Sequence, residues 1–118
     1  MNRARWIAMT VLVALVATLV ALGATTSSAS TTFTNRIKEN QTTHKYHYTP
    51  LTMTVHKGDT VVWKDRSDAP HTVSFNNGSF SKMVQPGGSV HRTFKKVGTF
   101  KYHCNIHTYM HGTITVAG

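Results

Sequence analysis

The stretch "KYHCNIHTYMHGTITV", Lys101 to Val116, contains the only cysteine of a chain of 118 residues. Ahead of the cysteine, apolar and polar residues alternate and place Tyr102 and Cys104 on one face, and β-branched residues dominate again from Thr113 to Val116. A period of two is typical of a β-strand with one buried face. The stretch therefore predicts two strands joined by a short loop, with the thiol pointing inward.

The same period of two recurs along the chain after residue 30. Apolar residues alternate with polar ones at 51–55, 61–63, 71–75, 90–94 and 99–103, and turn residues separate these runs at 57–59, 76–78 and 86–88. The runs 51–55 and 61–63, joined by a Lys-Gly-Asp turn, are expected to form a hairpin-like pair. Six or more short strands in so short a chain predict an all-β fold, an antiparallel sandwich or barrel.

Residues 1–30 differ from the rest of the chain. A basic start, Asn2 to Arg5, precedes the almost wholly apolar Trp6 to Gly23, which is the layout of a signal peptide. An uncleaved membrane anchor stays open as an alternative, because about 20 apolar residues cross a bilayer. We therefore assign 1–30 to a signal peptide or N-terminal membrane anchor, 31–43 to a polar linker and 44–118 to one domain. The protein is expected in the periplasm or at the outer face of the cytoplasmic membrane.

The chain is strongly basic, with 13 Lys and Arg against 4 Asp and Glu and a net charge of +9. Such a charge steers a protein toward acidic partners. Nucleic acid is not expected among them, because the basic residues are scattered, with no run longer than Lys95-Lys96, and because of the export signal. An acidic surface on a protein partner fits this charge.

A single cysteine in an exported protein indicates an intermolecular disulfide, a reactive thiol or a metal ligand. Here His107 and Met110 lie on the loop that follows Cys104, and His71 begins another inward-facing run. Two imidazoles, one thiolate and one distant thioether form the ligand set of blue-copper electron-transfer sites. Zinc is the competing metal, but a structural zinc site prefers four strong ligands, and a thioether is a poor fourth.

Three segments in order resemble the cupredoxin family, most closely its plastocyanin- and amicyanin-like members. They are "YTPLTMTVHKGDTVVW" at 48–63, "APHTV" at 69–73, and "YHCNIHTYMHG" at 102–112, which has the form C-x₂-H-x₂-M-x-G. The resemblance implies a Greek-key fold and one copper ion in a type 1 site. It also implies His71, Cys104 and His107 as equatorial ligands and Met110 as the axial ligand.

The resemblance further implies an electron carrier and not an enzyme. His107 would be the electron port, flanked by apolar residues where a redox partner docks, and the protein would work as a monomer. Two other functions stay open: a copper-handling protein that delivers or sequesters the metal, and a thiol enzyme with Cys104 as nucleophile. The thiol enzyme fits poorly, because Met110 then has no role.

Some positions depart from the family pattern or carry further histidines. Asp65 stands where an asparagine is common, and it is expected either to tie the ligand loops together through Asn105 or to cap a turn. Ile106 replaces a common proline, so its N–H is predicted to donate a second hydrogen bond to the cysteine sulfur. His111 is not expected to be a ligand because it adjoins Met110. His44 and His47 are a candidate weak second metal site.

Overall fold

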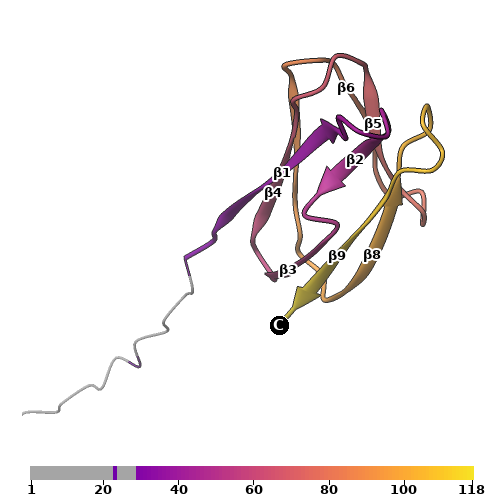
Figure 1. The fold of residues 1–118 in the computed structure, drawn as a ribbon. Helices are drawn as coiled ribbons and strands as arrows, with labels where there is room; N and C mark the ends of the chain where they lie inside the picture. Colours follow the sequence, from indigo (N-terminus) through magenta and orange to yellow (C-terminus); the bar gives the residue numbers. More distant parts are fainter. Residues whose placement is uncertain (1–22, 24–28) are drawn as a thin grey trace, which may run out of the picture.

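Two β-sheets pack face to face in the computed structural model, which describes residues 23 and 29–118 (Figure 1). One sheet has four strands in the order β2-β1-β4-β7 and the other has five in the order β3-β9-β8-β5-β6. The strands are β1 (Thr32–Glu39), β2 (Tyr46–Thr49), β3 (Thr52–His56), β4 (Thr60–Asp65), β5 (His71–Phe75), β6 (Ser81–Val84), β7 (Ser89–Thr93), β8 (Gly98–His103) and β9 (His111–Ala117). The predicted all-β sandwich is confirmed.

The strand pairing is mixed. Most neighbours are antiparallel, but β1 runs parallel to β4, and β3 runs parallel to β9. The expected hairpin of residues 51–55 with 61–63 is wrong, because β3 and β4 follow each other in sequence yet belong to different sheets. Alternation reports which face of a strand is buried, and it does not say which strand lies beside it.

The first strand corrects the predicted linker at residues 31–43. β1 pairs with both β2 and β4, and its Asn35 and Ile37 side chains are fully buried. Polar residues on the outer face of β1 conceal this alternation in the sequence. The domain therefore begins by Thr32. The proposed signal or anchor at 1–30 lies almost entirely outside the described residues, and the part of the chain that the structure describes contains no helix long and apolar enough to cross a membrane.

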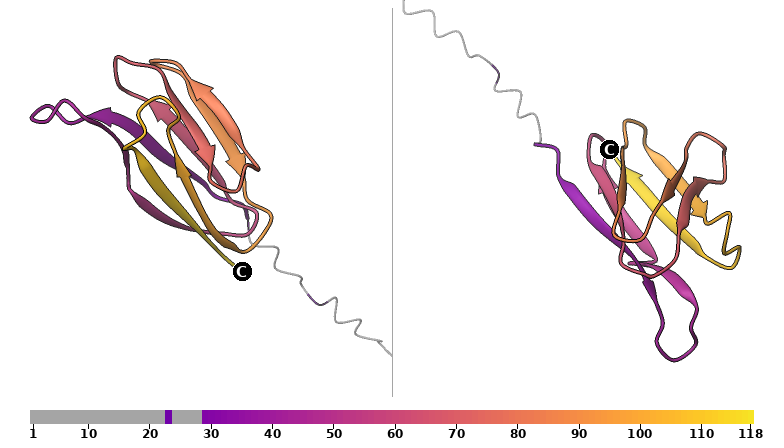
Figure 2. Two further views of the ribbon diagram at one scale, coloured as in Figure 1. Left: turned by 90° about the vertical axis from the view of Figure 1, so that its right-hand side faces the viewer. Right: turned by 90° about the horizontal axis from the view of Figure 1, so that it is seen from above.

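Aromatic residues fill the space between the sheets. The ring of Trp63, on β4, is fully buried and meets Tyr102 of β8 edge to face, with 5.5 Å between the ring centroids. Tyr48 of β2 meets the same tyrosine at 4.7 Å. The two layers are seen in Figure 2, where the loop between β1 and β2 projects from one end. Tyr102, which stands two residues before Cys104 in the sequence, thus packs against side chains of the opposite sheet.

Tyr102 also explains why position 112 is a glycine. Gly112 is its cross-strand partner on β9, and a Cβ atom at this position would lie 2.7 Å from the Cε1 atom of the tyrosine ring. A separation below 3 Å is incompatible with van der Waals contact, so the ring occupies the space that a side chain needs.

Gly112→Ala should therefore lower the free energy of unfolding by about 1–3 kcal/mol, because the buried tyrosine has no free direction in which to move. Urea denaturation of the metal-free protein measures this. Thr115→Ala, at a half-buried position of the same strand, is the matched control. Equal stability of the two variants would show that the ring moves aside without cost.

Candidate metal centre

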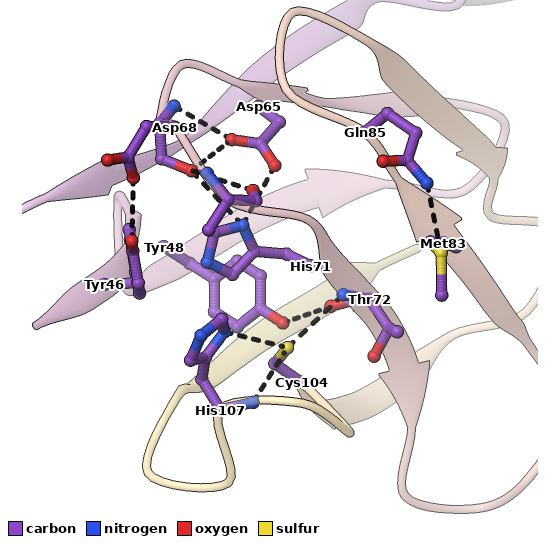
Figure 3. A network of polar contacts seen from close by, with 12 residues as sticks. Tyr46, Tyr48, Asp65, Asp68, His71, Thr72, Met83, Gln85, Cys104 and His107 are labelled. Carbon is purple, nitrogen blue, oxygen red and sulfur yellow. Dashed lines mark hydrogen bonds and ion pairs between the residues drawn. The ribbon is translucent and has the colours of Figure 1, made fainter.

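Strand pairing brings two distant segments to one end of the sandwich. β5 and β8 are antiparallel, with Ser74 opposite His103. The start of β5, at His71, therefore lies near the end of β8, where Cys104 follows. The loop from Cys104 to Met110 begins at this same point and returns the chain to β9. Figure 3 shows the side chains of His71, Cys104 and His107 turned toward a common region.

The sulfur of Cys104 is fully buried and accepts two backbone hydrogen bonds. The N–H of Thr72 donates to it at 3.3 Å and the N–H of His107 donates at 3.4 Å. The second donor is thus His107 and not Ile106, so the prediction for Ile106 is wrong. A tight loop directs the amide three residues after the cysteine back to the sulfur. Two N–H donors stabilise negative charge on sulfur and so favour a thiolate ligand.

The ligand loop is closed by its own backbone. The N–H of Met110 donates to the carbonyl of His107 at 2.9 Å, and the N–H of Cys104 donates to the carbonyl of Met110 at 3.2 Å. Met110 is 2% exposed, whereas His111 is exposed, as the alternation predicts. His107 lies with its Nδ1 atom 4.0 Å from the Cys104 sulfur. One short loop therefore gathers three of the four predicted ligands.

His71 supplies the fourth from the neighbouring strand. Its ring is fully buried, and its centroid is 4.7 Å from that of His107. Its Nδ1 atom lies 2.9 Å from the carboxylate of Asp65, which is also fully buried, and its Nε2 atom is buried without any hydrogen-bond partner. An unpartnered buried nitrogen is costly unless something binds it.

Asp65 positions this histidine and does not tie the loops together. Its other oxygen accepts the backbone N–H of Ser67 at 2.9 Å, which is the turn cap that the sequence offered as its second interpretation. The tie to Asn105 runs instead through Thr72, whose Oγ1 accepts the Asn105 N–H at 2.8 Å, while the Asn105 amide donates to Ser74 at 3.0 Å. Thr72 therefore bonds to both the sulfur of Cys104 and the backbone of Asn105.

Sequence reasoning missed Tyr46. Its ring lies 4.6 Å from that of His71 and 4.7 Å from that of His107, and its hydroxyl donates to Asp68 at 2.7 Å. The bond to Asp68 raises the pKa of Tyr46 to about 12. The only sequence signal is that Tyr46 and Tyr48 share one face of a short alternating run. The pairing of β2 beside β1 is what brings this face to the site.

The charge state of His107 also suits metal binding. Burial, with a smaller contribution from the nearby His71, lowers its pKa below the usual value of a histidine. The neutral imidazole with a free lone pair is therefore favoured at neutral pH. By contrast, His44 is exposed and bonds to Glu39 at 3.0 Å. None of its described contacts involves His47, and their proposed second site stays a prediction.

The residues at this end fit a soft metal ion. As they stand, the described residues contain no group of three or more His, Cys, Asp or Glu side chains arranged to hold a metal. The pairwise contacts nevertheless offer a sulfur that accepts two backbone N–H bonds, an imidazole beside it, and a buried imidazole nitrogen without a partner. Thioether sulfur, thiolate sulfur and imidazole nitrogen are donors that bind copper in preference to hard cations such as Mg²⁺ or Ca²⁺.

Asp65→Ala should lower the free energy of unfolding of the metal-free protein by about 1–3 kcal/mol, because it removes the carboxylate at 2.9 Å and leaves the buried His71 Nδ1 atom only the longer contact with the Ser67 hydroxyl at 3.3 Å. Denaturant titration followed by tryptophan fluorescence measures the change. Glu39→Ala is the control, because it removes a carboxylate whose partner His44 has a side chain that is 77% exposed. A cost for Asp65→Ala no larger than for this control would exclude a positioning role.

Comparisons with known proteins agree with this geometry. Residues 11–116 match the model of the Cupredoxin-like domain family. Amicyanin of Paracoccus denitrificans is 33% identical over 78 residues, which are 61% of this chain and 60% of its own length. Plastocyanin of Scenedesmus fuscus is 30% identical over 83 residues, which are 58% of this chain and 85% of the plastocyanin. The alignment thus spans only three fifths of the amicyanin.

Solved structures show the same fold. A purple cupredoxin from Nitrosopumilus maritimus aligns with a TM-score of 0.64 and 26% identity, over 72% of this chain and 99% of that one. A Cu(I) form of an amicyanin variant aligns with a TM-score of 0.57 and 30% identity, over 70% and 80%. Both similarities cover the sandwich.

Proposed function

The chain belongs to the cupredoxin family, which indicates a single type 1 copper ion as its cofactor, and we propose that it carries single electrons between redox proteins outside the cytoplasm. The observation that carries this proposal is the buried cysteine sulfur held by two backbone N–H groups beside two imidazoles. Copper supplies the Cu(II)/Cu(I) couple, and the protein supplies a fixed donor set.

In this proposal His71, Cys104 and His107 would be the strong ligands to copper and Met110 would be the weak one. Each has its own restraint. Asp65 holds the ring of His71, Thr72 holds the sulfur, and the backbone of the loop fixes His107 and Met110. Ligands held this firmly change little in position when the metal changes charge, so the rearrangement that limits electron transfer stays small.

His107 is the proposed electron port. It is the only half-exposed member of the proposed ligand set, since the other three side chains are buried. Around it, Ile106 and Tyr109 are each 46% exposed, and Pro70 is exposed nearby on the loop before β5. Exposed apolar side chains beside a redox ligand favour close approach of a partner. The net positive charge of the chain favours a partner with an acidic surface.

Addition of one equivalent of Cu(II) to the purified protein should produce an intense blue absorption band from thiolate-to-copper charge transfer. Cys104→Ser should abolish this band, because a hydroxyl oxygen cannot provide the transition. Optical titration measures both. An intense blue band in the serine variant would refute the assignment of Cys104.

Met110→Leu should keep the blue band and raise the reduction potential by tens of millivolts, because loss of a weak sulfur donor disfavours Cu(II) more than Cu(I). Voltammetry of the copper-loaded protein measures the shift. Met83→Leu is the matched control, because Met83 lies on β6 and is 56% exposed. A potential that is unchanged in both variants would remove Met110 from the ligand set.

Copper handling is the competing function for the same site. A delivery protein releases its metal quickly to an acceptor, whereas an electron carrier keeps it through many redox cycles. Burial of Cys104, His71 and Met110 supports retention. Exchange of Cu(I) into a chelator on the timescale of a few redox cycles would favour delivery over electron transfer.

A further inference from the structure

A tyrosine outside the proposed ligand set covers the two imidazoles. Tyr46 comes from β2, at the edge of the four-stranded sheet, whereas His71 and His107 belong to the other side of the sandwich. Its ring centroid lies 4.6 Å from one imidazole and 4.7 Å from the other. Tyr46 is half-buried and its ring packs against the fully buried His71, so the tyrosine contributes to the burial of the inner imidazole.

Tyr46 is held by hydrogen bonds at its hydroxyl and at its backbone N–H. Its hydroxyl donates to the Asp68 carboxylate, on the loop before β5, at 2.7 Å, as Figure 3 shows. Its backbone N–H donates to the hydroxyl of Tyr109, on the ligand loop, at 3.0 Å, and the Lys45 ammonium lies 5.6 Å from the ring centroid of Tyr109. Three segments far apart in the sequence thus meet at one residue.

We propose that Tyr46 is a positioning residue that closes this site. Its ring holds the imidazoles of His71 and His107 together before metal binds, and it keeps external thiol reagents away from the Cys104 sulfur and small coordinating anions away from the bound ion. The part that concerns the bound ion rests on the proposed function. A closed site has no open position for a substrate, so this residue restricts the centre to electron transfer.

The two parts of the tyrosine have separate roles. Edge-to-face and tilted contacts with the imidazoles require the ring and not the hydroxyl, and such contacts stabilise an arrangement beyond the area that they bury. The hydroxyl anchors the ring to Asp68. Tyr46→Phe therefore keeps the cover but loosens it, whereas Tyr46→Ala removes it.

The first test is the rate at which the Cys104 thiol of the metal-free full chain reacts with a dithiobis-nitrobenzoate reagent. The rate should rise roughly tenfold in Tyr46→Ala and less in Tyr46→Phe, because local opening then no longer has to break the aromatic contacts. Phe80→Ala is the matched control. It removes another half-buried ring, which lies near Trp63 and Phe75 on the far edge of the sandwich. Its thiol reaction rate should equal that of the unmodified chain when the two proteins are compared at the same free energy of unfolding.

A rate in Tyr46→Ala equal to that of the unmodified chain would overturn the proposal. If Tyr46→Ala does not fold, Asp68→Ala tests the same point, because it removes only the exposed anchor and should speed the reaction by roughly threefold. An unchanged rate in that variant would equally overturn it.

The second test uses the copper-loaded protein and azide. The absorption band should shift with azide in Tyr46→Ala but not in the unmodified chain, and a shift of equal size in both would contradict the closure. Absence of any blue band in the unmodified chain would refute the proposed function instead. The thiol rates of the metal-free protein would still decide whether Tyr46 closes the site.

Discussion

The backbone N–H of Thr72 pointing at the sulfur of Cys104 is the contact on which the rest of the site depends. It joins the start of β5 to the end of β8 through two buried atoms, and it exists only because these strands are antiparallel neighbours. The same residue holds Asn105 through its side chain, which fixes the direction in which the ligand loop leaves β8. His71, one residue earlier, is thereby brought beside that loop.

A second constraint acts from the opposite sheet. Asp65 at the end of β4 orients the ring of His71, and Tyr46 on β2 packs against both imidazoles. Both residues belong to the four-stranded sheet, whereas the four proposed ligands belong to the five-stranded sheet and its loops. Packing of the two sheets, centred on Trp63 and Tyr102, therefore also sets the geometry of the candidate metal centre.

Alternation was enough to predict the all-β fold, and the spacing of soft ligands was enough to propose four residues that the fold then places at one end of the sandwich. Residues 101–116 alone indicate two strands and the loop between them. The pairing of β3 with β9, the incorporation of β1 and the position of Tyr46 were not predictable in this way. Each depends on which strands become neighbours, and neighbours are chosen by packing across the whole core and not by local pattern.

The donor to sulfur illustrates the same limit at a smaller scale. The absence of proline at position 106 suggested a second N–H bond from Ile106, but the loop directs the amide of His107 to the sulfur, and that amide is available whatever residue precedes it. Local sequence tells which amides are available, and only the folded loop tells which one points inward. The role of Asp65 follows the same rule, because its partner is decided by where β4 ends.

X-ray absorption at the copper edge of the loaded protein, in both oxidation states, tests the central claim most directly. We expect one short copper–sulfur contact and two imidazole nitrogens, with little change in these contacts on reduction. A copper ion surrounded only by nitrogen and oxygen, or a coordination shell that rearranges on reduction, would contradict it.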